Sequence, residues 1–442
     1  MLIFHYLKRG IDVRIRLSYG LKGIELDIPR ENLAGVIEPA TSLKPFADPV
    51  RELVRVIENP HGDRLDQIAA GRSVCVLVED HTRNEPHSEM LDAITPYLTD
   101  ASHVEFIVAT GSHEVDHPEN LRIVTEIERA ASEASIDDYR VSIHDCHDTN
   151  MVRIGDTSRG TPVIINSRAA HHDVYVVLAD MKAHYFAGYS NALKDFLPGI
   201  CAFESIEANH AMALDPNSTF GRHPYHPDPR RRNNPLADDM REAMEMITRG
   251  ARVFTLSVIS SDHKVLWADA GLIRPVTERG IQVLDENTSF TVRPTTRIIV
   301  SPGGYPEDKS LYHAQRALEL TKNAVRDGGE VLFLAECKDG VAPPEATENF
   351  YQRLRAPLDT VLASISERYH LYEHKAYKFA ELLKRVSTIK MYTELQEDLV
   401  DSVHMQKVND AQGVVDQWIS QDPGVQILVF DKGNKLAVYS EA

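Results

Sequence analysis

Polar and reactive side chains directly follow three short apolar runs that read as buried strands. They are Asp80-His81-Thr82-Arg83 after the first run, Gly111-Ser112-His113 after the second, and Asp180 with His184 after the third. In open α/β sheets, ligands bind outside the carboxyl ends of the strands. The sequence therefore predicts that these segments converge on one crevice.

The side chains of the first segment suit an anionic or hydroxylated ligand. Arg83 offers a planar fork of donors that fits a carboxylate or a phosphate, and Asp80 could orient it or accept a ligand hydroxyl. A plain surface ion pair is the alternative. Their place in a strand-to-helix turn, rather than on a helix face, favours the binding role.

His113 and His184 are candidates for acid–base chemistry. Imidazole titrates near neutral pH, and a reaction on both faces of one carbon needs two such groups. A single histidine is more often structural. The matched positions of these two at strand ends favour a catalytic role.

The segment from His184 to Gly199 is dense in Gly, Ser, Asn and Pro, as expected of a loop that approaches a ligand closely. Lys194 within it could bind phosphate or become covalently modified, or could simply face solvent. His210 follows on a predicted helix and is chemically suitable as a nickel or zinc ligand.

Composition narrows the class of protein. The 442 residues carry a net charge of −18, which disfavours nonspecific binding to nucleic acid or anionic lipid. Four scattered cysteines predict reduced thiols, and the N-terminal residues do not resemble a secretory signal. We expect a cytoplasmic protein without a membrane span. The basic run Arg230 to Arg232 is interpreted as part of a solvated loop.

Short β-branched runs alternate with amphipathic stretches, which predicts an α/β fold of mostly parallel sheets flanked by helices. The expected strands are 73–79, 104–109, 173–179, 297–301 and 330–336. The length exceeds what one core usually organises, so two domains are expected, with the active site in the crevice between them. The predicted division is 1–285, 286–420, and a tail at 421–442 that packs back on the first domain.

These segments together resemble the lactate racemase family, whose members carry a nickel-pincer nucleotide. The resemblance covers most of the chain. Its motifs are a D-x-T-R turn, a G-x-H strand end, an H-x-F-A-G-Y-S…K…P-G loop and a later histidine, here Asp80 to Arg83, Gly111 to His113, His184 to Gly199, and His210.

The resemblance implies a racemase or epimerase that inverts C2 of a small 2-hydroxy acid. It implies that Lys194 holds the cofactor, pyridinium-3,5-bisthiocarboxylic acid mononucleotide nickel, through a covalent thioamide, and that separate biosynthetic enzymes supply it. His210 would complete the nickel coordination, Arg83 would hold the substrate carboxylate, and His113 and His184 would exchange protons with the hydroxyl. The remaining cofactor contacts would come from Asp80, Thr82, Tyr189 and Ser190.

The chain departs from the family pattern at three places. Asn191 and Ala192 stand where the family usually has two glycines, and Glu114 where arginine is frequent. His313 and Arg316 replace a glutamine and a lysine that face the substrate. Because arginine can bind a carboxylate with two bonds and His313 adds a donor or acceptor, we expect a larger or more polar 2-hydroxy acid than lactate.

Two other functions remain open from the residues. A metal-dependent hydrolase could use the histidines and aspartates at 144–148 and 171–173, although they lack a helical metal-binding spacing. A ligand-binding homologue without catalysis is compatible with Asn191 and Ala192. Zinc without nickel would indicate the first, and cofactor uptake without turnover the second.

Overall fold

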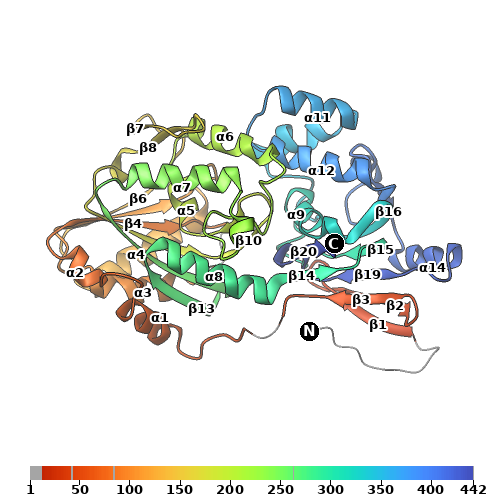
Figure 1. Ribbon diagram of the computed structural model, residues 1–442, viewed down its shortest axis with the longest axis horizontal. Helices are drawn as coiled ribbons and strands as arrows, with labels where there is room; N and C mark the ends of the chain where they lie inside the picture. The colour runs from red at the N-terminus through yellow and green to blue at the C-terminus, as the bar shows by residue number, and fades with distance from the viewer. Residues whose placement is uncertain (1–11, 41–42, 83–84, 262, 442) are drawn as a thin grey trace. The chain divides into compact units, whose positions relative to one another are not determined.

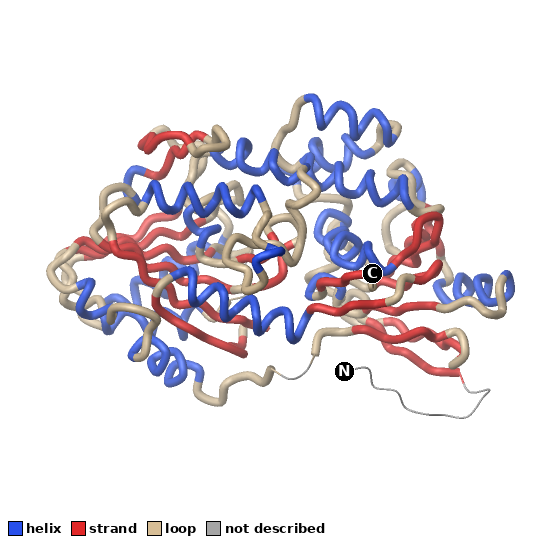
Figure 2. Tube along the Cα trace, viewed as in Figure 1, coloured by secondary structure: helices blue, strands red, loops and turns tan. Residues whose placement is uncertain are grey.

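The computed structural model describes residues 12–40, 43–82, 85–261 and 263–441. The chain forms two compact units. The larger unit spans 41–287, and the smaller unit joins the described residues up to Ala40 to those from Thr288 onward. Helices flank the strands in each unit (Figures 1 and 2). The predicted class, α/β with mostly parallel sheets, is confirmed.

A six-stranded sheet lies at the centre of the larger unit, in the order β13-β12-β9-β4-β5-β6. Its strands are β4 (Ser73–Glu79), β5 (His103–Ala109), β6 (Tyr139–Ile143), β9 (Val174–Asp180), β12 (Arg252–Ser261) and β13 (Lys264–Gly271). All neighbours pair in parallel except β12 and β13, which are antiparallel. Strands covered on both faces read as continuous apolar runs, which explains their Val-rich sequences.

Successive strand residues point to opposite faces of this sheet. On one face, Val74, Val76 and Val78 pack in a core that includes buried side chains of α1 to α4. On the other, Tyr175 packs on Phe196 of α5, with ring centroids 5.8 Å apart. The helices are α1 (Pro49–Glu58), α2 (Leu65–Ala69), α3 (His87–Ile94), α4 (Pro118–Glu133), α5 (Leu193–Phe196), α6 (Phe203–Ala211), α7 (Pro235–Ile247) and α8 (Ile273–Thr288).

Two short hairpins complete the larger unit. One pairs β7 (Met151–Asp156) with β8 (Pro162–Asn166), and the other pairs β10 (Lys182–His184) with β11 (Gly188–Ser190). The second hairpin follows β9 directly, so it starts at the carboxyl edge of the sheet.

The smaller unit has its own six-stranded sheet, ordered β18-β17-β16-β15-β19-β3 and parallel throughout. Its strands are β3 (Leu33–Ile37), β15 (Thr295–Val300), β16 (Val325–Leu334), β17 (Thr388–Tyr392), β18 (Gln406–Val408) and β19 (Ile427–Phe430). The additional pairs are β1 (Asp12–Leu17) with β2 (Ile24–Pro29), and β14 (Ser289–Val292) with β20 (Ala437–Ser440). The helices are α9 (Leu311–Thr321), α10 (Pro344–Ala346), α11 (Leu358–Glu367), α12 (Glu373–Arg385), α13 (Glu397–Asp401) and α14 (Ala411–Gln421).

The division of the chain differs from the predicted one at both ends. Residues 12–40 belong to the smaller unit, because β3 forms the edge of its sheet beside β19. The tail at 421–442 also belongs there, since β19 pairs with β15 inside that sheet. The other boundary lies between Asn287 and Thr288, whereas the predicted one lies between 285 and 286. The predicted crevice between the domains stays a prediction.

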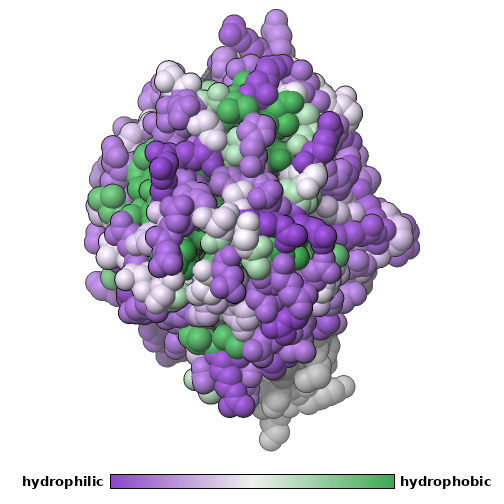
Figure 3. Space-filling model, turned by 90° about the vertical axis from the view of Figure 1, so that its left-hand side faces the viewer, coloured by the Kyte–Doolittle hydropathy of each residue, from purple (hydrophilic) through white to green (hydrophobic). Residues whose placement is uncertain are grey.

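Among the helices of the described residues, none is long and apolar enough to cross a bilayer. The face drawn in Figure 3 is mostly hydrophilic, with small and separate apolar areas.

Candidate functional site

Asp80 and His113 form a hydrogen-bonded pair at the carboxyl ends of neighbouring strands β4 and β5. The Asp80 Oδ2 atom lies 2.7 Å from His113 Nδ1, and Asp80 is buried whereas His113 is 39% exposed. The Thr82 hydroxyl donates to Asp80 Oδ1 over 2.6 Å. Asp80 therefore holds the proton of His113 on Nδ1, which leaves Nε2 as the proton acceptor. Arg83, predicted to bind the substrate, lies outside the described residues.

His184 and Lys194 meet on the segment that follows β9. The Lys194 Nζ atom is 3.0 Å from His184 Nε2, and the lysine is only 7% exposed. The backbone N–H of Ala187 donates to His184 Nδ1 over 3.2 Å, which orients the ring. A lysine buried to this extent is not the solvent-facing lysine that a loop position ordinarily suggests.

His210 on α6 belongs to the same neighbourhood. Its ring lies edge-on to Phe186, with centroids 5.3 Å apart, and Phe186 in turn packs edge-on to His184 at 4.4 Å. Burial, followed by the positive charge of Lys194, lowers the pKa of His210 to about 3. The imidazole is thus neutral at physiological pH, which is the form that ligates metals.

A small cavity of about 20 Å³ brings His113 and Lys194 together. Its lining is Glu79, Asp80, Ala109, Thr110, Gly111, His113, Lys194, Asp195, Pro198 and Gly199. The Gly111 N–H donates to the Gly199 carbonyl over 3.0 Å, which ties the two loops. A Cβ on Gly199 would lie 2.2 Å from the Asp195 carbonyl oxygen, so this close approach requires glycine.

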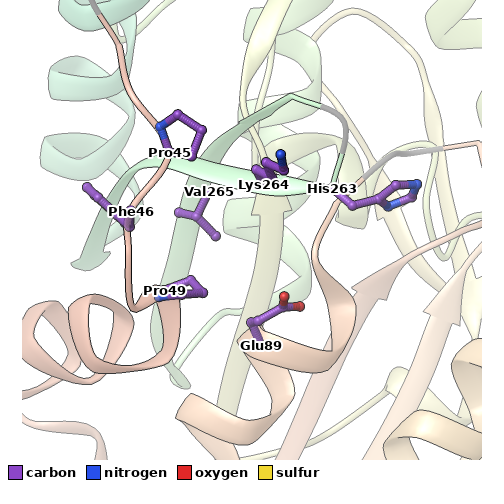
Figure 4. A pocket seen from close by; sticks show the side chains of 7 residues that line it. All are labelled: Pro45, Phe46, Pro49, Glu89, His263, Lys264 and Val265. Atoms are coloured by element: carbon purple, nitrogen blue, oxygen red, sulfur yellow. The ribbon is translucent and has the colours of Figure 1, made fainter.

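A larger cavity, of about 290 Å³, has a different character. Pro45, Phe46, Pro49, Glu89, His263, Lys264 and Val265 line it, and Figure 4 shows its polar side chains apart from one another. None of the predicted site residues lines it. Its size alone does not make it the candidate site.

The segment that leads to Lys194 accommodates Asn191 and Ala192 without strain. Ala192 has the right-handed helical angles φ −51° and ψ −21°, which any residue adopts. The Asn191 carbonyl oxygen Oδ1 accepts from the Leu193 N–H over 2.9 Å, and its amide contacts His223 Nε2 at 3.0 Å. The two residues thus order the segment instead of crowding it.

Ser190 and Tyr189, both predicted to contact a cofactor, differ in their surroundings. The Ser190 hydroxyl is fully buried, and its oxygen has no hydrogen-bond partner within the described residues. The Tyr189 hydroxyl donates to Asp285 of α8. Ser190 is therefore available to a bound group, whereas the Tyr189 hydroxyl anchors the hairpin.

The loop at 215–235 is not merely solvated, because its side chains bind α8 and the hairpin of β10 and β11. Arg231 donates to Asp285 Oδ2 over 2.8 Å, and Asn234 donates to the Phe186 carbonyl over 2.8 Å. A Cβ on Gly188 would stand 1.8 Å from the Arg222 carbonyl oxygen, so β11 passes directly under this loop. The sequence does not reveal these contacts.

A buried ion pair stabilises the turn after β4. His87 Nε2 is 2.9 Å from Glu85 Oε1 and 2.9 Å from the Glu79 carbonyl oxygen. Burial lowers the pKa of His87, but the Glu85 charge and these bonds outweigh it and bring the pKa to about 9.

This pair predicts a pH dependence of stability. Because the folded pKa of His87 lies above its ordinary 6.5, its contribution is complete below pH 6.5 and is lost as pH rises through 9. We expect roughly 3 kcal/mol of unfolding free energy to disappear across this window. Urea unfolding of the wild type and of a Glu85→Gln/His87→Gln reference measures it, and parallel pH curves for the two proteins would refute it.

The histidines considered for a hydrolase do not assemble a metal site. His144 Nε2 lies 2.9 Å from the Cys201 carbonyl oxygen, and burial lowers the pKa of His144 to about 4. His172 Nε2 contacts the Arg168 carbonyl at 2.8 Å. In the part of the chain that the structure describes, no three His, Cys, Asp or Glu side chains are arranged to hold a metal ion. The hydrolase interpretation is therefore not supported.

In the smaller unit, His313 and Arg316 lie in the first turns of α9. His313 Nδ1 is 2.7 Å from the Ser310 hydroxyl. Lys375 of α12, which the sequence did not single out, donates to the Tyr312 carbonyl and lies 3.6 Å from the centre of its ring. Burial, then the charge of Arg316, holds the pKa of Lys375 well below its usual value. Lys375 lies on the buried face of α12, so the sequence signal that points to it is a lysine at an otherwise apolar helix position.

Comparison with known proteins identifies the family. The family models of the lactate racemase N-terminal and C-terminal domains match residues 19–221 and 291–431. Lactate racemase of Thermoanaerobacterium thermosaccharolyticum is 29% identical over 353 residues, which are 78% of each chain. Lactate racemase of Lactiplantibacillus plantarum is 26% identical over 416 residues, covering 89% of this chain and 92% of that one.

Solved structures agree with this grouping. The lactate racemase apoprotein of T. thermosaccharolyticum superposes with a TM-score of 0.83 at 25% identity, covering 96% of this chain and 100% of that one. A Thermotoga maritima protein shares the fold, with a TM-score of 0.61 at 15% identity over 89% of this chain and 97% of that one. The chain belongs to the lactate racemase family and is an isomerase of the racemase type.

Proposed function

We propose that the chain inverts C2 of a small 2-hydroxy acid by reversible hydride transfer to a nickel-pincer nucleotide bound covalently to Lys194. The observation that supports this proposal most is the cavity that His113 and Lys194 line together, with His184 Nε2 3.0 Å from the Lys194 amine. This arrangement places two candidate acid–base groups, His113 and His184, close to the buried amine of Lys194. We also propose cytoplasmic function, in line with four free cysteines, and a supply of the nucleotide by separate biosynthetic enzymes.

The residues present suit such a group. Lys194 supplies an amine for the covalent link, and neutral His210 supplies an imidazole nitrogen, a donor that suits nickel. The buried Ser190 hydroxyl, without a partner among the described residues, can donate to the bound group. When bound, the nucleotide supplies the hydride acceptor and donor that amino-acid side chains lack.

The side chains supply proton transfer and orientation. His113, with Nδ1 held by Asp80, removes the hydroxyl proton through Nε2 from one enantiomer, and His184 does so for the other. The other histidine would donate its own proton to the carbonyl oxygen of the 2-keto acid as the hydroxyl re-forms with the opposite configuration at C2, and proton exchange with solvent would restore both histidines. Arg83 is proposed to hold the carboxylate. A direct cofactor contact of Asp80, Thr82 or Tyr189 stays a prediction.

Solvent deuterium tests the hydride step. Racemisation of an enantiopure 2-hydroxy acid in D₂O is expected to leave the C2 hydrogen in place, because a hydride does not exchange with water. NMR of the product measures the retained hydrogen. Deuterium at C2 in step with racemisation would indicate proton abstraction from carbon and would exclude the proposed chemistry.

His313 and Arg316 are proposed to select a substrate larger or more polar than lactate. Arginine binds a second polar or anionic group with two bonds, in a geometry that lysine does not provide. We expect kcat/KM for longer, polar 2-hydroxy acids to exceed that for lactate by about 10-fold or more, the effect of one good charged hydrogen bond. Arg316→Lys should lower the ratio of kcat/KM for the longer, polar acids to kcat/KM for lactate. A wild-type preference for lactate would contradict the proposal.

A further inference from the structure

A buried asparagine joins the two loops that carry Asp80 and His113. Asn120 is the third residue of α4 and has no exposed surface. Its Oδ1 accepts from the backbone N–H of His81 over 3.0 Å, and its Nδ2 donates to the carbonyl oxygens of Glu114 and Val115 over 2.9 and 3.2 Å. One amide therefore binds the residue after Asp80 and the residue after His113.

The orientation of this amide is determined by its partners. A backbone N–H only donates and a carbonyl only accepts, so Oδ1 must face His81 and Nδ2 must face Glu114 and Val115. His81 Nδ1 lies 3.1 Å from the same Oδ1, so it carries a hydrogen. Only a side-chain amide offers donors and acceptor together in one short planar group.

The beginning of α4 also fixes the His81 ring. The rings of His81 and His117 stack with centroids 3.8 Å apart and an angle of 8°. His117 is held in turn because its Nδ1 accepts from the Glu119 N–H over 3.3 Å. The loop after β4 is thus attached to α4 through both backbone and side chain.

We propose that Asn120 is a positioning residue, which keeps the two loops at the separation where Asp80 meets His113. The Asp80–His113 bond of 2.7 Å runs from one loop to the other, and each loop leaves a different strand. Outer hydrogen bonds of this kind set the tautomer and aim of a histidine. The inference rests on the proposed role of His113 in proton transfer.

Asn120→Asp and Asn120→Ala test the inference, with Asn32→Ala as the matched control. Asp keeps the shape and the acceptor but loses both donors, so it separates bonding from packing. Asn32 is also buried and donates to two carbonyls, those of Pro423 and Val425, each over 2.9 Å. Its loss removes a similar pair of bonds in the smaller unit.

The first readout is the tautomer of His113, measured by long-range ¹H–¹⁵N NMR of histidine-labelled protein without cofactor. Wild type and Asn32→Ala should show hydrogen on Nδ1 alone, and both Asn120 variants a mixture. In loaded enzyme, kcat should fall about 10- to 100-fold in the Asn120 variants with little change in KM.

The outcomes separate the two proposals. An unchanged His113 tautomer and wild-type kcat in folded Asn120→Asp would overturn the role of Asn120. If Asn120→Ala does not fold, the isosteric Asn120→Asp variant alone decides the question. Full activity of a His113 variant would instead overturn the proposed function. The NMR result does not depend on that activity.

Discussion

Lys194→Ala should give a protein that retains no nickel, carries no added mass and racemises 2-hydroxy acids only at the background rate. The reason is chemical: only an amine at this position can form the proposed covalent link, and alanine offers none. The Lys194 amine is buried beside His184, so a neighbouring surface lysine cannot replace it. Nickel analysis, intact mass and a polarimetric assay measure the three effects.

Lys182→Ala is the control for this variant. Lys182 lies on β10, in the hairpin that carries His184, but its amine pairs with Asp180 over 3.0 Å. Its removal should leave nickel content and added mass unchanged. Nickel binding and turnover in Lys194→Ala would contradict the proposal that Lys194 forms the covalent link.

His113→Asn should lower kcat by about 10²- to 10⁴-fold in both directions of racemisation, the usual worth of a general acid or base. Both directions should be slowed because the proposed mechanism uses one histidine to remove a proton and the other to supply one in each turnover. KM should change little, since Arg83, not His113, is proposed to hold the substrate carboxylate. Rates from each enantiomer, followed by chiral chromatography, test this expectation.

His147→Asn provides the comparison, because His147 is exposed and stacks on Phe203 with centroids 5.0 Å apart. It should keep wild-type rates. In His113→Asn, kcat/KM should fall equally from the two enantiomers, because the equilibrium constant of a racemisation is one. Unchanged rates from both would remove His113 from the mechanism.

The sequence predicts the site best where residues that follow neighbouring strands also lie close together in the structure. Asp80 and His113 follow adjacent parallel strands, and the general rule that ligands bind at carboxyl edges placed them together before any contact was known. The burial of Lys194 could be suspected only through the family motif. The 3.0 Å contact between His184 and Lys194 depends on how a hairpin and a short helix fold back, which local patterns do not encode.

Long-range pairing explains the remaining differences. Nothing in residues 33–37 signals that they pair with 427–430, some four hundred positions later. The predicted division therefore places residues 12–40 in the larger unit, whereas they belong to the smaller one. The run Arg230 to Arg232 is predicted to be solvated because its contacts, such as that of Arg231 with Asp285, join residues that are distant in sequence. Asn120 carried no signal at all, since a helical asparagine is ordinary until its partners are known.

Peptide mass spectrometry with nickel analysis, on protein produced together with the enzymes that make the nickel-pincer nucleotide, is the most direct test of the central claim. The expected result is a covalent adduct on the peptide that contains Lys194, with one nickel per chain. An unmodified Lys194 peptide and no nickel, in protein that still racemises a 2-hydroxy acid, would contradict it.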